Sequence, residues 1–410
     1  MDERKEFGHQ MFGRNPRFAY LRPKDRYLAR LDPPRHHFNV IGTGINGQEQ
    51  IRVSQLEGRA TTHGVFDPNP GSIAAAQALM AQLAPGQTLK VYETLEAACN
   101  DPAADGLIIS TPNHTHLDVV RTAVKSGKHI LLEKPMATTL NDAYEIARLA
   151  TSHPARFQVG LQYRFKPMYS EAIHEALERG MIGDIKTISI LEHRVPFLDK
   201  VGQWNKFSEL SGGTLVEKCC HYFDLFNLFA RSRPMRVFAS GSQAVNFKSF
   251  EYAGKPSDIL DNAFVTVEYA NGVRANFNLC MFAPMIYEEI VLCGDAGRIK
   301  GHELEHYRPG IQRECKLEVI TGADRVSRIS EPSYPKHVEE SGHHGGTYIE
   351  RARFIDGIEG KPVKTASVSE GFWSIVIGVA AEASVKSGQV VDIASLLKQH
   401  GVNPAEIGMA

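Results

Sequence analysis

The 410-residue sequence lacks the features that would place it in several specialised classes of protein. Its six cysteines show no CxxC spacing and are too sparse for a disulfide scaffold. No apolar run approaches the ~20 residues that a membrane span needs, and none near the start predicts a secretory signal. We therefore expect a protein of the reducing cytoplasm with no membrane partner.

Net charge is also nearly absent, because 46 basic residues face 47 acidic ones, for a formal charge of -1. The chain as a whole is therefore not attracted to nucleic acid. Residues 1–36 are predicted to form a separate arm that is locally basic and carries several aromatic residues. A nucleic-acid-binding arm is the alternative, but no recognition fold accompanies it. We expect the arm to pack along the domain surface or across a subunit interface.

Two domains follow the arm. Residues 37–155 alternate short apolar runs with helical stretches, which predicts βαβ units and a doubly wound parallel sheet. Residues 156–410 are β-rich, and "YANGVRA" places Asn-Gly between two alternating runs, a strong hairpin signal. This second domain is predicted to be α+β, with an open and mainly antiparallel sheet.

A glycine-rich turn, "GTGING" at 42–47, follows the first strand and opens a helix. Such glycines let the backbone approach a pyrophosphate, whose charge the helix N-terminus stabilises. Asp67 lies twenty residues beyond Gly47, where a ribose-binding acid is expected, and its charge favours NAD over NADP. A tight turn without a ligand is the alternative. The cofactor residues predicted here are Gly42, Gly44, Ile45, Asn46, Gly47 and Asp67.

Four further motifs follow in order: "STPNHTH" (110–116), "EKP" (133–135), "VGLQYRF" (159–165) and "GGTLVEKCCHYFDLFNLF" (212–229). With them, residues 37 to about 390 resemble the glucose–fructose oxidoreductase and inositol dehydrogenase family, Gfo/Idh/MocA. The resemblance implies an N-terminal Rossmann domain and a C-terminal domain whose open sheet often forms the oligomer interface. We therefore expect a homo-oligomer, a dimer or a tetramer. Glu217 stands where the family commonly has Asp.

Lys134 is the first catalytic candidate. It follows a predicted strand of the doubly wound sheet, and such strand ends face the ligand crevice. Its ammonium group could bond a sugar hydroxyl and stabilise negative charge on that oxygen as hydride leaves the carbon. The alternative is a surface lysine paired with Glu133. The resemblance implies that the Lys134–Pro135 bond is often cis.

His221 and Glu217 are four residues apart, so on one helix they share a face. His221 is the candidate general base for the hydroxyl proton, and Glu217 could orient the imidazole or hold a neighbouring hydroxyl. The alternative is a buried structural histidine.

The family pattern implies further residues for each ligand. Those on the cofactor side are Thr111, Pro112, Asn113, His116, Glu133, Lys134 and Gln162. Those on the substrate side are Tyr163, Arg164, His193, Arg194, Trp204 and His344, with His343 beside the last. Each of the substrate-side residues could equally be a solvated or packing side chain.

"HELEH" at 302–306 satisfies the HExxH zinc-protease signature. That chemistry needs a helix that puts both histidines on one face, and a third ligand. Nearby glycines and a proline within a β-rich region predict a strand or turn instead, so we expect no metal site.

Together these features predict an NAD-dependent oxidoreductase that moves hydride between nicotinamide and a carbon of a sugar, glycoside or polyol. One alternative is a redox-neutral, NAD-dependent glycosidase, and the basic residues Arg164, Lys166, His193 and Arg194 would suit an anionic sugar such as a sulfoquinovoside. A third possibility is a non-catalytic regulator that senses the dinucleotide.

Overall fold

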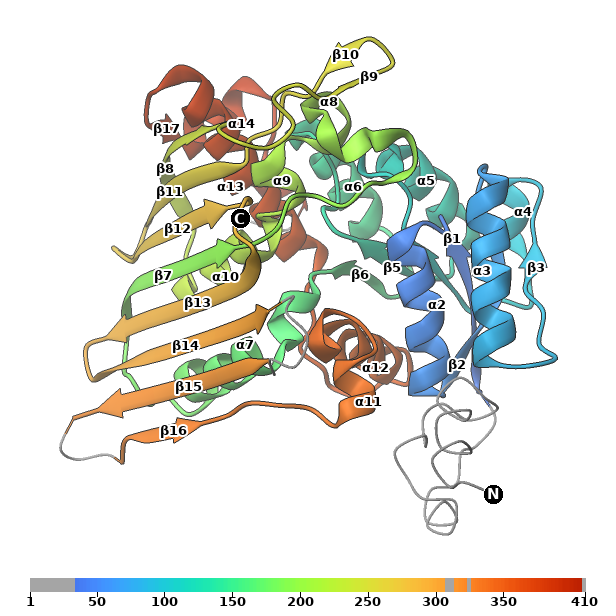
Figure 1. Cartoon of the computed structure of the whole chain (residues 1–410), viewed down its shortest axis with the longest axis horizontal. Helices are drawn as coiled ribbons and strands as arrows, with labels where there is room; N and C mark the ends of the chain where they lie inside the picture. Colours follow the sequence, from blue (N-terminus) through green and yellow to red (C-terminus); the bar gives the residue numbers. More distant parts are fainter. Residues whose placement is uncertain (1–33, 307–312, 323–325, 408–410) are drawn as a thin grey trace. The chain divides into compact units, whose positions relative to one another are not determined.

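The computed structural model describes residues 34–306, 313–322 and 326–407, which fall into two compact units (Figure 1). The predicted N-terminal arm lies almost wholly outside the described residues. Unit 1 contains the described residues up to Glu133, then Leu149–Phe165 and Tyr334–Val368. Unit 2 contains the remaining segments, beginning with Lys134–Arg148. The units therefore interleave along the chain, whereas the sequence suggested one boundary near residue 155.

The sheet of unit 1 has six parallel strands in the order β3-β2-β1-β4-β5-β6. This is the doubly wound dinucleotide-binding order, and it confirms the predicted Rossmann domain. The strands are β1 His36–Ile41, β2 Ala60–Phe66, β3 Lys90–Val91, β4 Gly106–Ile109, β5 His129–Glu133 and β6 Phe157–Gly160. The helices between them are α2 Ile45–Glu57, α3 Pro70–Leu83, α4 Leu95–Asn100, α5 His116–Ala123 and α6 Leu140–Thr151.

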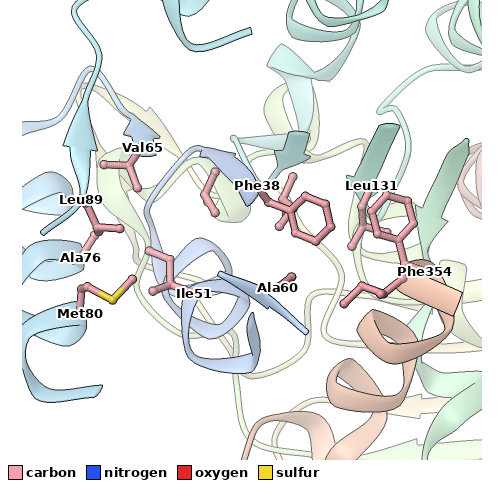
Figure 2. Close-up of a cluster of buried hydrophobic side chains, with 12 residues drawn as sticks. Phe38, Ile51, Ala60, Val65, Ala76, Met80, Leu89, Leu131 and Phe354 are labelled. Atoms are coloured by element: carbon pink, nitrogen blue, oxygen red, sulfur yellow. The ribbon is translucent and has the colours of Figure 1, made fainter. Parts of the chain in front are cut away.

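A late helix completes the core of unit 1. Helix α12 (Gly346–Ile358) packs against α2, after the short α11 (Lys336–Glu339). Its Phe354 lies 5.8 Å, centroid to centroid, from the ring of Phe38 in β1, and both side chains are fully buried (Figure 2). The nucleotide-binding unit therefore depends on a segment from the far end of the chain.

The sheet of unit 2 has nine strands in the order β16-β15-β14-β13-β7-β12-β11-β8-β17. Only β12 and β7 pair in parallel among these described neighbours, which confirms the predicted mainly antiparallel sheet. The strands are β7 Ile185–His193, β8 Pro234–Ser242, β11 Asn262–Tyr269, β12 Arg274–Cys280, β13 Met285–Gly294, β14 Gly297–His306, β15 Glu314–Thr321, β16 Arg328–Ser330 and β17 Val391–Asp392, with β9 Glu251–Tyr252 and β10 Lys255–Pro256 as a separate pair. The helices are α7 Pro167–Ile173, α8 Ser208–Ser211, α9 Thr214–Glu217, α10 Cys220–Ala230, α13 Val368–Ser387 and α14 Ile393–Gln399.

Strand β11 shows why one face of this sheet is covered and the other is open. Its residues alternate, so Ala263 and Val265 are buried while Phe264 between them is 63% exposed. Helix α10 contacts β7, and α7 contacts β14 and β15. The predicted Asn-Gly turn joins β11 to β12, and Gly272 there has a φ of 86°.

Helix α13 is the one described helix that is long and apolar enough to cross a membrane, judged by length and composition. We expected no apolar run of that length, because serines, glycines and a glutamate interrupt the apolar residues of this segment. Of its most apolar window, 56% is buried inside the fold, as in the core helix of a globular protein.

Candidate active site

Five strands of unit 1 place predicted cofactor residues at one edge of the sheet. Gly42 follows β1, Asp67 follows β2 and Thr111 follows β4. Glu133 ends β5, and Gln162 follows β6. Because all these strands are parallel, their carboxyl ends share an edge, where doubly wound sheets bind ligands.

The glycine turn is built for close approach. A Cβ on Gly42, whose φ is 88°, would lie 2.7 Å from the backbone of Ser110, and one on Gly47 would lie 2.0 Å from the Gly42 oxygen. A Cβ on Gly44 would meet nothing within 4 Å. Gly42 and Gly47 therefore allow close backbone contacts that a side chain would block. Gly44 leaves the backbone accessible just before α2 begins at Ile45. Asn46 lies in the same first turn of that helix.

Asp67 ties the end of β2 to this turn. Its Oδ2 accepts a hydrogen bond from the Thr43 amide at 2.7 Å, and its Oδ1 accepts one from the Asn69 amide at 2.8 Å. The carboxylate therefore stands beside the glycine turn, where a ribose acid is expected.

The loop after β4 is held by its own side chains. A ring nitrogen of His116 lies 3.1 Å from the Thr111 carbonyl oxygen, and Pro112 precedes the single turn that leads to α5. Two buried polar atoms at this edge, Nδ2 of Asn113 and Oε1 of Gln162, have no hydrogen-bond partner within the described structure. Buried polar groups are normally paired, so these atoms suit the ribose or amide groups of a bound dinucleotide.

Glu133 belongs to a buried network that the sequence did not reveal. Its Oε1 accepts a hydrogen bond from Gln50 Nε2 at 2.7 Å, and Gln50 in turn accepts one from Arg351. Arg351 is fully buried and also donates to Ser54 Oγ at 2.6 Å. Arg351 of helix α12 therefore holds Gln50 of α2, which in turn holds the carboxylate of Glu133.

A second buried carboxyl, Glu350, lies beside this network. Burial, with the neighbouring Glu133 carboxylate, raises the pKa of Glu350 well above its usual range. Neither of its oxygens has a hydrogen-bond partner among the described residues. Burial therefore favours the protonated form of Glu350, which lies next to Glu133.

The two predicted histidines after Gly342 lie in a strained turn at the start of α12. His343 and His344 have φ values of 44° and 53°, which are rare outside glycine. His343 Nδ1 lies 2.8 Å from Oε1 of Glu49 in α2, and its ring lies 6.1 Å from that of Tyr163. Arg164, next along the chain, is also buried in unit 1.

In unit 2, Lys134 meets the segment that carries Glu217. Its Nζ donates a hydrogen bond to the Glu217 main-chain oxygen at 3.1 Å and lies 3.8 Å from Oε1. The peptide bond between Lys134 and Pro135 is cis, as the family resemblance implied.

Three lysines keep Glu217 ionised. Burial alone would raise the pKa of this carboxyl, but Lys134, Lys200 and Lys218 outweigh burial and lower it to about 2. Lys200 Nζ is within 3.3 Å of Oε1. Glu217 is therefore an acceptor at any physiological pH.

His221 is buried, but the predicted single helix is two helices. Helix α9 ends at Glu217 and α10 begins at Cys220, with a turn over Lys218 and Cys219 between them. The expectation that Glu217 and His221 share the face of one helix was wrong, because their spacing in the sequence does not reveal the turn that separates α9 from α10. Burial raises the pKa of the Cys220 thiol to about 12, so it stays protonated beside the histidine.

The other predicted substrate residues divide between the units. Tyr163, Arg164 and His344 lie in unit 1, whereas His193, Arg194 and Trp204 lie in unit 2 with Lys134 and His221. The Lys200 Nζ that approaches Glu217 also lies 4.4 Å from the ring centroid of Trp204.

His193 is the last residue of β7, and Arg194 lies just beyond it. Arg194 Nη1 lies 3.7 Å from Oε1 of Glu192, which Lys218 approaches to 2.9 Å. The ring of His193 is tilted against that of Tyr287 at 6.4 Å. Lys218 could have been suspected, because it adjoins Glu217 in the motif, but Lys200 and Glu192 carry no sequence signal.

Lys166, which the sequence suggested for the substrate side, lies elsewhere. It is fully buried and pairs with Glu288 at 2.7 Å and with Glu303 at 3.4 Å. Glu303 is the first of the two glutamates of the HELEH motif, and the motif lies in strand β14. Residues four apart in a strand are separated by about 13 Å, so His302 and His306 are too far apart to share a metal ion.

Both parts of the chain match models of one oxidoreductase family. Residues 36–161 match "Oxidoreductase family, NAD-binding Rossmann fold", and residues 174–393 match "Oxidoreductase family, C-terminal alpha/beta domain". The chain belongs to the Gfo/Idh/MocA family. The resemblance drawn from the motifs is thereby confirmed.

The matched relatives and structures include proteins named as dehydrogenases of inositol and of levoglucosan. The chain is 25% identical over 359 residues to inositol 2-dehydrogenase of Rhizobium meliloti, covering 87% of this chain and 99% of the relative. It is 27% identical over 200 residues to the rhizopine catabolism protein MocA of Rhizobium meliloti, covering 49% of this chain and 59% of that protein. A structure of levoglucosan dehydrogenase with NADH and levoglucosan matches the fold with a TM-score of 0.70, at 20% identity, over 87% of this chain and 99% of that one.

NAD is the cofactor of the Rossmann domain of this family member. The residues of unit 1 fit it: the open backbone at Gly44, the acid Asp67, and the unsatisfied amide atoms of Asn113 and Gln162 all lie at or beside the strand ends. The acid is where a ribose hydroxyl would be bound and a 2′-phosphate repelled.

Proposed function

We propose that the chain is an NAD-dependent oxidoreductase that transfers hydride between nicotinamide and the hydroxyl carbon of a sugar, glycoside or polyol. Lys134 carries the proposal. It directly follows Glu133, at the ligand-binding edge of the Rossmann sheet, and its ammonium group contacts the segment that bears Glu217. The names of the family relatives support the substrate class.

Bound NAD supplies the hydride acceptor at its nicotinamide. Lys134 holds the substrate hydroxyl and stabilises the negative charge that develops on its oxygen during oxidation. Its own charge is balanced by the Glu217 carboxylate at 3.8 Å, which stays ionised because its pKa is about 2. The ammonium can therefore remain in a buried position without an isolated charge.

His221 is the proposed general base. It follows the Glu217 segment by four residues and is almost fully buried in the first turn of α10. A base in this position removes the hydroxyl proton as hydride departs and typically contributes about 10²–10⁴-fold to the rate. Arg194 and Trp204 in the same unit are proposed to contact the substrate, and a substrate contact of Tyr163, Arg164 and His344 in unit 1 stays a prediction.

The test is NADH formation from NAD over a panel of sugars, glycosides and polyols. The proposal predicts stoichiometric NADH with at least one of them, and loss of that activity in both Lys134→Met and His221→Asn. Aglycone release with no net NADH would instead support the redox-neutral glycosidase. NAD binding without any chemistry over the whole panel would support a regulator.

We also propose a homo-oligomer in the cytoplasm. The open face of the unit 2 sheet exposes Phe264 and Phe238 on adjacent strands, which an oligomer interface would cover. All six cysteines are free thiols, as a reducing compartment requires.

A further inference from the structure

The one-turn helix α9 carries Glu217 at its end but has no local cap at its start. The backbone amides in the first turn of a helix need acceptors from outside the helix, and the N-cap side chain usually supplies one. Here the N-cap residue is Gly213, whose φ is 87° and which has no side chain to accept a hydrogen bond. The segment that bears Glu217 therefore needs an acceptor from elsewhere in the chain.

Glu382 of α13 provides that acceptor. Its Oε1 accepts a hydrogen bond from the Leu215 amide at 2.9 Å, although the two residues are 167 positions apart in the sequence. Burial raises the pKa of this carboxyl to about 6, so above that pH the acceptor is charged. A hydrogen bond to a charged acceptor is roughly twice as strong as one between neutral groups. Glu382 thus caps α9 from a helix that no sequence motif connects with it.

Two glycines allow this carboxylate and the α9 segment to approach each other. A Cβ on Gly213 would lie 2.3 Å from Glu382 Oε1. A Cβ on Gly378, one turn before Glu382 in α13, would lie 2.9 Å from the Leu215 carbonyl oxygen. A side chain at either position would push the two elements apart, so the close contact depends on both glycines.

The α9 turn links this contact to Lys134. The Glu217 amide donates a hydrogen bond to the Gly213 carbonyl oxygen at 2.9 Å. The main-chain oxygen of Glu217 in turn accepts the hydrogen bond from Lys134 Nζ at 3.1 Å. Leu215, whose amide Glu382 holds, lies only two residues before Glu217. A shift of this turn therefore moves the acceptor that positions the Lys134 ammonium.

We propose that Glu382 is a positioning residue for hydride transfer. Its hydrogen bond from the Leu215 amide holds α9, and the Glu217 main chain then holds Lys134 in place. This inference rests on the proposed function, in which Lys134 acts on the substrate hydroxyl. A displacement of about 1 Å in a reacting group costs on the order of 100-fold in rate, so loss of this hydrogen bond should lower kcat.

Two variants separate the hydrogen bond from the bulk of the side chain. Glu382→Met keeps a side chain of similar length without an oxygen, and it should lower kcat by about 10–100-fold. Glu382→Gln keeps an oxygen that the Leu215 amide can reach, so its kcat should stay within about threefold of the parent value. Lys386→Met, at an exposed position one turn further along α13, is the control and should keep the parent kcat. A parent-like kcat in Glu382→Met, or an equal loss in Glu382→Gln, would overturn the inference.

A double-mutant cycle with Lys134→Met tests whether Glu382 acts through that lysine. In the Lys134→Met background there is no ammonium to position, so Glu382→Met should lower kcat by less than about threefold. A role in folding alone would give the same fold-loss in both backgrounds, and that result would overturn the inference. If Glu382→Met does not fold, Glu382→Asp takes its place, because its carboxylate is set back by one methylene from the Leu215 amide.

Hydrogen exchange provides a readout that needs no activity. The backbone amides of residues 213–217 should exchange about tenfold faster in Glu382→Met than in the parent chain or Glu382→Gln, because the Leu215 amide loses its acceptor. Unchanged exchange there would overturn the inference. A parent chain that forms no NADH over the whole panel would contradict the proposed function, whereas an active parent with an unaltered kcat in Glu382→Met would contradict the positioning role alone.

Discussion

Lys134 Nζ donates a hydrogen bond to the main-chain oxygen of Glu217 at 3.1 Å, and the same ammonium lies 3.8 Å from the Glu217 carboxylate. The lysine of the EKP motif is thus positioned by the backbone of the segment that we propose to be catalytic, and the side chain of Glu217 in that segment balances its charge. The Glu217 carboxylate thus places an opposite charge beside an ammonium group that is only 9% exposed.

Replacing Lys134 by Met should lower kcat/KM by about 10²–10³-fold, because the charge that stabilises the developing oxyanion is lost. Folding should persist, since Lys200 and Lys218 remain to balance Glu217. Steady-state kinetics on the substrate identified by the panel measures the effect. Lys186→Met, at an exposed lysine of β7, is the control and should keep full activity. Turnover by Lys134→Met close to that of the control would contradict this role.

Arg351→Met should destabilise the fold by about 3–5 kcal/mol, because it breaks a fully buried hydrogen-bonded network and leaves polar partners unsatisfied. The affected partners are Gln50 and Ser54. Urea unfolding gives the change in the free energy of unfolding.

Arg353→Met on the same helix is the matched control for Arg351→Met. Its guanidinium is 51% exposed and lies 3.7 Å from Asp356, so the loss should stay below about 0.5 kcal/mol. Equal decreases in the free energy of unfolding of the two variants would contradict the prediction that the buried network stabilises the fold more than the exposed ion pair does.

Glu382 should make stability depend on pH. Burial raises its pKa from 4.5 to about 6, although the Leu215 amide donates to its Oε1 at 2.9 Å. Below pH 4.5 both the folded and unfolded chains hold the proton. Between pH 4.5 and 6 the unfolded chain releases it and the folded chain does not, so the free energy of unfolding falls as pH rises, by at most about 2 kcal/mol.

Glu382→Gln should remove that fall, which urea unfolding at a series of pH values will measure. Glu251→Gln, at an exposed position in β9, should leave the pH dependence as it is. If the free energy of unfolding of Glu382→Gln still fell between pH 4.5 and 6 as it does in the parent chain, the assignment of this pH dependence to Glu382 would be contradicted.

Phe264→Lys should reduce the molar mass of the oligomer, because it puts a charge on the open face of the nine-stranded sheet. Light scattering after size-exclusion chromatography measures that mass, and circular dichroism checks that the fold is kept. Val91→Lys is the control, since Val91 is also exposed but lies on the edge strand β3 of unit 1. A particle of unchanged mass in Phe264→Lys would place any interface elsewhere.

Local patterns predicted the Rossmann sheet and the Asn-Gly hairpin because both depend on neighbouring residues. The same holds for the glycine turn and Asp67, which lie within one βαβ unit. The sequence also predicted the family from its motifs. It did not predict that α12 joins the nucleotide-binding unit, since that contact is made between distant segments.

The sequence also failed to predict some residues of the candidate site, because these residues too are brought together from distant segments. Arg351 is linked to Glu133 by hydrogen bonds through Gln50, and Lys200 reaches Glu217 from a loop with no motif of its own. Buried charge networks of this kind are set by tertiary contacts, which spacing along the chain does not encode. The sequence misplaced Lys166 for a similar reason, because its partner Glu288 lies in a distant strand.

The most direct test of the central claim is a crystal structure of the chain with NAD and the substrate that the panel identifies. We predict that Lys134 Nζ and a ring nitrogen of His221 both lie within hydrogen-bonding distance of one substrate hydroxyl, whose carbon faces C4 of the nicotinamide. A substrate bound with every hydroxyl away from these two side chains would contradict the claim.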